Sequence, residues 1–308
     1  MILSPAWLAR ACKLNPIFQS KLRFVIRPGW PTSVSSPEFA EMVASFQKEA
    51  GLDPVDGVLG PVTLAKVNGD VLSPPAAGGE LIVDGSPLQV PFPVVTWKDP
   101  AGLSFYLPET KTFWATRRNV PAKVNLFVLH WDGCTSSRQC YQVLVERHLS
   151  VHLMLDADGT VFQALDLATA KAYHASVVNE RSVGVEICNP VTPSRNRYCS
   201  PPRAVIADKG VNGSHDAAHL DFYDVQKERV VQLANALAEI FGIPKVLPRA
   251  PRWKSHLPGE PDPAGSVIRR TLEDVQGFAG VCGHFHVSDQ KDDPGNTLWD
   301  GLSVAGWG

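Results

Sequence analysis

The stretch VNLFVLH, residues 124–130, decides the fold class of this chain. Val124 to Leu129 is an almost continuous apolar run of strand length, as expected for a sheet strand that is covered on both faces. The run ends at His130, where the strand end holds a side chain rigidly at the edge of the sheet. Ser182 to Ile187 predicts one more short strand, so the larger part of the chain is expected to contain a sheet.

Helical and hairpin patterns alternate with these strands. Asp158-Gly159 lies between two apolar stretches and predicts a tight hairpin. Apolar residues recur at helical spacing from Tyr141 to His148 and from Val230 to Phe241. Strands interleaved with helices predict an α/β fold with a mixed central sheet flanked by helices. Residues 190–222 and 244–266 are rich in Pro, Arg, Asp and Gly and predict long surface loops that carry substrate contacts.

The pattern of the N-terminal part predicts a separate helical unit. Phe39 to Phe46 has helical spacing, with Ser36 as N-cap, Pro37 at the first position and Gly51 at the end. Further helices are expected over 5–23 and around Leu64 and Val67. The stretch from Asp70 to Gly85 has little to bury and indicates a linker. We therefore expect a small all-α domain over 1–70, a linker over 71–85 and a larger domain over 86–308, its motifs falling within 120–300.

Composition excludes several classes of protein. The 308 residues carry 29 basic and 31 acidic side chains, so a net charge of −2 provides no basic field for nucleic acid or an anionic membrane. No apolar run approaches the roughly 18 residues of a membrane-spanning helix. Met1 to Lys13 lacks the basic and apolar regions of a secretory signal, so we expect synthesis in the cytoplasm and delivery by a non-Sec route. We expect a monomer.

Histidines at strand ends and beside carboxylates are the candidates for chemistry. His130 closes the apolar strand, and His284 and His286 precede Asp293. Two imidazoles and a carboxylate suit catalytic zinc, although a histidine at a strand end is more often structural. If the chain is extended here, alternation places His284 and His286 on the same face and leaves either one as a ligand.

The order of the motifs is more specific than any one of them. The chain carries, in sequence, Val128-Leu129-His130; Ser150-Val151-His152 with Asp158-Gly159-Thr160; Ala172-Tyr173-His174-Ala175; Ser182-Val183-Gly184-Val185-Glu186; and Gly283-His284 with Lys291-Asp292-Asp293-Pro294-Gly295. This order resembles that of the type 2 N-acetylmuramoyl-L-alanine amidases, zinc enzymes related to peptidoglycan recognition proteins and to phage lysins. In addition, Val43 to Thr63 resembles the second half of a peptidoglycan-binding helical domain.

The resemblance implies roles for individual residues. His130, His284 and Asp293 would bind one zinc ion per chain, with His284 preferred over His286 because the histidine of the family follows a glycine. Glu186 would be the general base and Lys291 would stabilise the oxyanion.

The resemblance also concerns three further histidines and a pair of cysteines, for which it implies no single role. His152, His174 and His286 match or neighbour positions that line the cleft of the family, where they would contact substrate; a structural role is equally compatible with the sequence. Cys134 and Cys140 resemble a cysteine pair found in some relatives, which would form a disulfide.

The implied reaction is hydrolysis of the amide between N-acetylmuramic acid and L-alanine in peptidoglycan. Two alternatives stay open: a peptidoglycan-binding protein without catalysis, and a zinc peptidase that cuts within the stem peptide. A phage lysin, a secreted toxin and a cell-wall recycling enzyme all fit the sequence, with action expected at the cell wall or in the periplasm.

Overall fold

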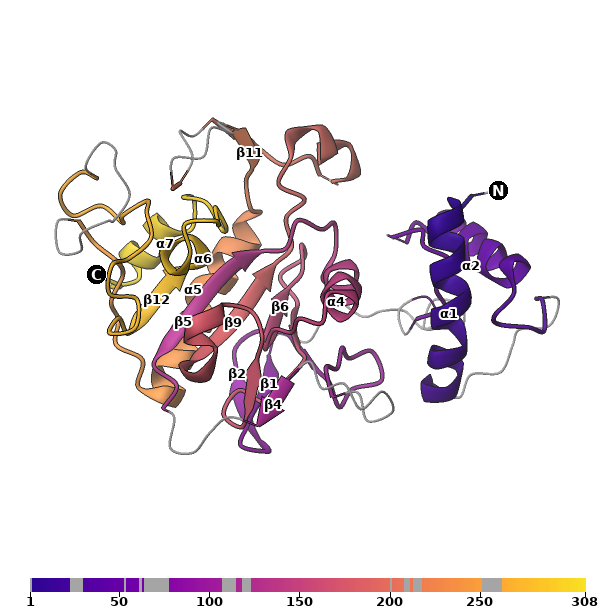
Figure 1. Ribbon diagram of the computed structural model, residues 1–308, viewed down its shortest axis with the longest axis horizontal. Helices are drawn as coiled ribbons and strands as arrows, with labels where there is room; N and C mark the ends of the chain where they lie inside the picture. Colours follow the sequence, from indigo (N-terminus) through magenta and orange to yellow (C-terminus); the bar gives the residue numbers. More distant parts are fainter. Residues whose placement is uncertain are drawn as a thin grey trace. The chain divides into compact units, whose positions relative to one another are not determined.

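The computed structural model describes residues 2–22, 30–52, 54–60, 63, 78–106, 115–117, 123–199, 201–207, 211–212, 218–250 and 262–308. The chain divides into two compact units (Figure 1). The first comprises Met1–Ala76 with Lys98–Gly102, and the second comprises Ala77–Trp97 with Leu103–Gly308. The helix expected around Leu64 and Val67 lies outside the described residues.

Two helices form the described core of the first unit, α1 (Pro5–Leu22) and α2 (Pro37–Glu49). The side chain of Ser36 accepts a hydrogen bond from the backbone N–H of Phe39, and Pro37 occupies the first helical turn, which confirms the predicted start of α2. Gly51 has a φ of +67°, the left-handed conformation that ends helices.

A single buried glutamine organises the turn that follows α2. The side-chain amide of Gln47 donates to Asp56 Oδ1 at 2.9 Å, to the Val58 carbonyl at 3.1 Å and to Thr63 Oγ1 at 3.1 Å. Its oxygen accepts from the backbone N–H groups of Asp56 and Gly57 at 3.0 and 2.8 Å. Gly57 is required in this turn because a Cβ there would lie 2.7 Å from the carbonyl oxygen of Ala40.

The second unit is built on a six-stranded sheet with the order β12-β5-β9-β6-β7-β3. β5 pairs in parallel with β12 and β9, whereas β6 and β7 form an antiparallel hairpin around Asp158-Gly159. The predicted mixed sheet is therefore confirmed. The strands are β3 (Val94–Thr96), β5 (Leu126–Trp131), β6 (Leu153–Leu155), β7 (Val161–Gln163), β9 (Ser182–Ile187) and β12 (Gly280–Gly283).

Smaller elements surround this sheet (Figure 1). The helices are α4 (Ser137–Glu146), η1 (Ser176–Arg181), η2 (Pro193–Tyr198), α5 (Asp224–Phe241), α6 (His284–Val287) and α7 (Trp299–Val304). Two-stranded pairs are formed by β1 (Gly79–Val83) with β2 (Ser86–Val90), by β4 (Ala115–Arg117) with β8 (Ala170–Ala172), and by β10 (Val205–Ala207) with β11 (Ala218–Leu220).

Two segments differ from their predicted form. β1 begins inside the expected linker, because Leu81 and Ile82 are buried and the side chain of Gln163 bonds both backbone groups of Ile82. The 190–222 region contains η2 and the β10–β11 pair, and Arg203 in it is buried. Residues 71–77 and 251–261, which belong to the expected linker and to the second expected loop, lie outside the described residues.

Side-chain alternation gives the two faces of the sheet different partners. On β5, Phe127 and Leu129 pack in the cluster that contains Val230 and Leu233 of α5. Leu126 and Val128 of the same strand belong to a separate cluster on the opposite face. His130 follows in the period-two pattern, so it lies on the face away from α5, at the end of the strand.

Candidate metal centre

The strand register brings His130 next to Glu186. β5 and β9 are parallel, with Leu126 opposite Ser182, Val128 opposite Gly184 and His130 opposite Glu186. Val183, Val185 and Ile187 face α5, so Ser182, Gly184 and Glu186 share the face of His130. The alternation in SVGVEI thus places Ser182, Gly184 and Glu186 on one face of the sheet and the three apolar side chains on the other face.

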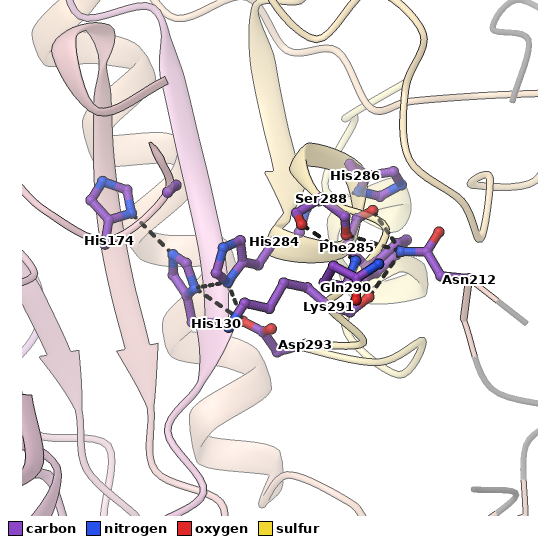
Figure 2. A network of polar contacts seen from close by, with 12 residues as sticks. His130, His174, Asn212, His284, Phe285, His286, Ser288, Gln290, Lys291 and Asp293 are labelled. Carbon is purple, nitrogen blue, oxygen red and sulfur yellow. Dashed lines mark hydrogen bonds and ion pairs between the residues drawn. The ribbon is translucent and has the colours of Figure 1, made fainter. Parts of the chain in front are cut away.

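His130, His284 and Asp293 converge at the end of β5 (Figure 2). His130 Nδ1 lies 3.0 Å from His284 Nδ1 and 3.0 Å from Asp293 Oδ2, and His284 Nδ1 lies 3.1 Å from Asp293 Oδ2. The short helix α6 starts directly after β12, which is the parallel neighbour of β5. The backbone N–H of Phe285 donates to the carbonyl of Asp293, which ties the start of α6 to the Asp293 segment.

The ionisation of this cluster is set by burial and by the mutual contacts. Burial, followed by the neighbouring His284, lowers the pKa of His130 to about 4, although Asp293 acts in the opposite direction. Burial opposes the charge of Asp293, but the hydrogen bonds from His130 and His284 outweigh it and lower the pKa of this carboxyl. Neutral imidazole and ionised carboxylate are the forms that bind metals.

These three side chains fit zinc in chemistry and spacing. Two nitrogens and one carboxylate oxygen are one of the donor sets found in catalytic zinc sites, which keep one position open. Zinc bonds of about 2.0–2.1 Å in tetrahedral geometry place ligand atoms roughly 3.3 Å apart. The three distances in the cluster, 3.0, 3.0 and 3.1 Å, are close to that spacing.

Glu186 carries a buried carboxylate oxygen next to the cluster. Its Oε2 atom has no hydrogen-bond partner among the described residues. Burial, together with the negative charge of Asp293, raises the pKa of Glu186 well above its usual range. A raised pKa makes the ionised carboxylate of Glu186 a stronger base than an ordinary glutamate.

Lys291 extends its side chain towards the cluster from the loop that follows α6 (Figure 2). Its positive charge contributes to lowering the pKa of His130 and counteracts the rise in the pKa of Glu186. The backbone of Lys291 is held by Asn212, whose side-chain amide donates to the carbonyl oxygens of Phe285, Ser288 and Lys291 at 3.1, 3.1 and 2.9 Å.

His286 does not lie beside His284. The segment is a helical turn rather than an extended chain, so the expectation that both histidines share one face is wrong. His286 is fully buried, its Nδ1 accepts from the Gly283 N–H at 2.9 Å, and its Nε2 donates to the Ile268 carbonyl at 2.7 Å. Burial lowers the pKa of His286 to about 3. Both ring nitrogens are thus used by the backbone.

His152 and His174 also make their contacts inside the protein. His152 is fully buried, accepts from the Gly184 N–H at 3.2 Å and donates to the Ala170 carbonyl at 3.1 Å. His174 is only partly buried, and its Nδ1 lies 3.0 Å from His130 Nε2. Its Nε2 lies 3.1 Å from Ser182 Oγ.

The two cysteines that resemble a disulfide pair are not joined by a disulfide bond in the structure. Cys134 and Cys140 are both buried, and burial, followed by a hydrogen bond with Cys134, raises the pKa of Cys140 well above its usual range.

Sequence reasoning missed two residues near the site, Asp132 and Asn212. Asp132 Oδ1 accepts from the N–H groups of Cys134 and Asn189, and burial raises its pKa well above the usual value. The place of Asp132 directly after the strand that carries His130 is a signal that sequence reading could have used. Asn212 lies far from Lys291 in sequence, and nothing local distinguishes it from an ordinary turn asparagine.

The sequence profile of the N-acetylmuramoyl-L-alanine amidase family matches residues 120–296, which is more than half of the chain. The chain belongs to this amidase family. A second profile, that of a peptidoglycan binding domain, matches residues 18–67. No curated protein matches the sequence of this chain significantly.

Solved structures of amidases are also similar to this one. The AmiD amidase of E. coli aligns over 62% of this chain and 62% of its own at 19% identity, with a TM-score of 0.36. AmpDh3 of Pseudomonas aeruginosa aligns over 63% and 64% at 19% identity, with a TM-score of 0.38. The endolysin LysCS of Clostridium intestinale aligns over 61% and 86% at 12% identity, with a TM-score of 0.37. The chain thus spans less than two thirds of AmiD and of AmpDh3.

No helix in the part of the chain that the structure describes combines the length and apolar character that crossing a membrane requires.

Proposed function

We propose that this amidase is a zinc hydrolase that cleaves the amide between N-acetylmuramic acid and L-alanine in peptidoglycan. The observation that carries the proposal is the convergence of His130, His284 and Asp293 within 3.0–3.1 Å of one another, in a chain whose residues 120–296 match this family. The three side chains would hold the metal.

Zinc at this position would polarise the scissile carbonyl and lower the pKa of a bound water to about 7. Glu186 takes the proton of the attacking water and passes it to the leaving amine. Its buried Oε2, which has no hydrogen-bond partner in the described part of the chain, and its raised pKa suit a group that accepts this proton. General acid–base catalysis of this kind contributes about 10²- to 10⁴-fold.

Lys291 stabilises the negative charge that develops on the carbonyl oxygen. Its side chain points at the cluster, and its charge acts on both His130 and Glu186. Asn212 fixes the backbone of Lys291 by a 2.9 Å hydrogen bond, so the ammonium group is positioned before substrate arrives.

The first unit binds the polymer and keeps cleavable bonds close to the site. This part of the proposal rests on the profile match over 18–67. A tethered binding unit raises the effective concentration of substrate without changing the chemical step. It therefore adds affinity for intact cell wall more than turnover, and the domain division proposed here is 1–70 for binding and 86–308 for hydrolysis.

Digestion of purified peptidoglycan by the wild type and by Glu186→Gln tests the proposal. We expect mass spectrometry to find free stem peptides that begin with L-alanine and glycan without peptide, with turnover about 10²- to 10⁴-fold lower in the variant. Glu239→Gln, at an exposed position on α5, is the matched control and should keep the wild-type rate.

The same digest separates the alternatives. Fragments cut within the stem peptide would indicate a peptidase, and a wild type that binds peptidoglycan but releases nothing would indicate a recognition protein. Wild-type turnover in Glu186→Gln would reject Glu186 as the base.

A further inference from the structure

The second ring nitrogen of His130 contacts another histidine. His130 Nδ1 belongs to the cluster with His284 and Asp293, while its Nε2 lies 3.0 Å from Nδ1 of His174. A metal-binding histidine almost always donates its other N–H to a carboxylate, a backbone carbonyl or water. Here an imidazole takes that place, and Figure 2 shows the contact on the side of His130 away from Asp293.

The contacts of His174 give this hydrogen-bond chain a direction. When His130 Nδ1 binds a metal, the proton of the ring is on Nε2, so Nε2 donates and His174 Nδ1 accepts. The proton of neutral His174 is then on its own Nε2, which donates to Ser182 Oγ at 3.1 Å. Both ring nitrogens of His174 are therefore engaged within the protein.

Gly184 makes room for this arrangement. A Cβ at Gly184 would lie 2.5 Å from Nδ1, 2.6 Å from Cε1 and 2.9 Å from Cγ of His174, so any other residue would displace the ring. Gly184 stands between Ser182 and Glu186 on the polar face of β9. The rings of His130 and His152 both meet His174 edge-on, with centroids at 5.2 and 5.8 Å, which leaves it little freedom to rotate.

We propose that His174, seated over Gly184, is a positioning residue that fixes the tautomer and orientation of His130 for metal binding. The inference rests on the proposed function, because it needs His130 to be a ligand. It replaces the direct substrate contact expected for His174. Removal of such an outer partner typically lowers metal affinity about 10- to 100-fold.

Three substitutions of His174 distinguish the contact of its Nδ1 with His130 from the contact of its Nε2 with Ser182. Asn carries Oδ1 on Cγ, as His carries Nδ1, so His174→Asn keeps an acceptor for His130 Nε2. His174→Gln places its polar group one bond further out, near Ser182, and His174→Ala has neither. Zinc affinity is measured by competition with a chromogenic chelator, and the thermal midpoint of the metal-free protein is measured for each variant.

We expect the zinc affinity of His174→Ala and of His174→Gln to be about 10- to 100-fold lower than that of the wild type. The logarithm of the loss in His174→Asn should be at most about half of that in His174→Ala. A merely structural role would weaken zinc binding in step with the thermal midpoint, without selective rescue by Asn. Equal zinc affinity in wild type and His174→Ala overturns the inference.

A double-mutant cycle tests the part played by Gly184. Gly184→Ala alone should lower zinc affinity by about the same factor as His174→Ala. In the His174→Ala background the new methyl group has space, so Gly184→Ala should then change affinity by less than about threefold. If Gly184→Ala lowered zinc affinity by the same factor in the wild type and in the His174→Ala background, Gly184 would not act through His174.

Zinc binding by the wild type distinguishes failure of the proposed function from failure of this inference. A wild type that binds no zinc removes the proposed function and this inference together. A wild type that binds zinc and hydrolyses its substrate, with unchanged zinc affinity in His174→Ala, removes only this inference.

Discussion

Asn212 holds the loop that carries Lys291, and its replacement tests how that loop is positioned. The side-chain amide donates to the carbonyl oxygens of Phe285, Ser288 and Lys291. Its oxygen accepts from the backbone N–H of Thr271 at 2.9 Å. One side chain thus joins the helical turn of His284 to the segment that leads to Asp293, and truncation removes all of these bonds at once.

The size of the effect follows from those contacts. A hydrogen bond contributes about 0.5–1.5 kcal/mol net, and a buried group left unsatisfied costs about 1–3 kcal/mol. Two N–H groups and one acceptor therefore give a loss of about 2–4 kcal/mol for Asn212→Ala. For a domain of roughly 150–250 residues, 1 kcal/mol shifts Tm by about 2–4 °C, so Tm should fall by about 4–16 °C. Turnover should fall as well, because Lys291 loses its anchor.

Two further variants distinguish the loss of the side-chain hydrogen bonds of Asn212 from the strain in its backbone. Asn212 has a φ of +51°, which glycine adopts freely and alanine does not. Asn212→Gly therefore removes only the side-chain bonds and should lose less stability than Asn212→Ala. Asn212→Asp keeps the acceptor for Thr271 but turns an oxygen towards three carbonyl oxygens. Calorimetry and turnover are measured for each; wild-type Tm and kcat in Asn212→Asp would refute the reasoning.

Three further changes have expected outcomes. Because burial raises the pKa of Glu186, the folded protein holds this proton more tightly than the unfolded chain, so the contribution of Glu186 to the stability of the metal-free protein should fall as pH rises above about 4.3. Urea unfolding from pH 4 to 8 should show the wild type losing stability relative to Glu186→Gln, and a constant difference between the two proteins would contradict this. Gln47→Leu removes the buried hydrogen bonds of the turn after α2 and should destabilise the first unit by about 2–4 kcal/mol. The variant should no longer sediment with insoluble peptidoglycan but should still hydrolyse a short soluble fragment. Loss of both activities would argue against separate units. Leu129→Ala, at a fully buried position beside His130, should cost about 2–5 kcal/mol by chemical denaturation, and a cost below about 1 kcal/mol would show that the strand is not core.

The fold was largely predictable because its signals are local. The apolar run before His130 and the Asp158-Gly159 turn each correspond to an observed element, β5 and the β6–β7 hairpin. Ser36 caps α2 as its sequence context indicates. Capping, turn chemistry and periodicity act over a few residues, so a single sequence contains them.

The arrangement of the candidate site was less accessible, because it depends on contacts between distant segments. Side-chain alternation could not separate His284 from His286, since that distinction requires knowing that residues 284–287 form a helical turn, and only the family resemblance favoured His284. The role of Gly184 depends on the His174 ring that lies over it. Asn212 reaches the Lys291 loop across 79 positions of sequence, and no local pattern indicates that contact.

Metal content of the purified protein shows whether His130, His284 and Asp293 form a zinc site. It is measured by inductively coupled plasma mass spectrometry on wild type, His130→Ala and His284→Ala, with His148→Asn as the control. His148 is exposed and has a φ of +61°, which asparagine tolerates. We expect about one zinc per chain in wild type and control and little in the two ligand variants. No zinc in the wild type after reconstitution, or equal zinc in all four proteins, would contradict this expectation.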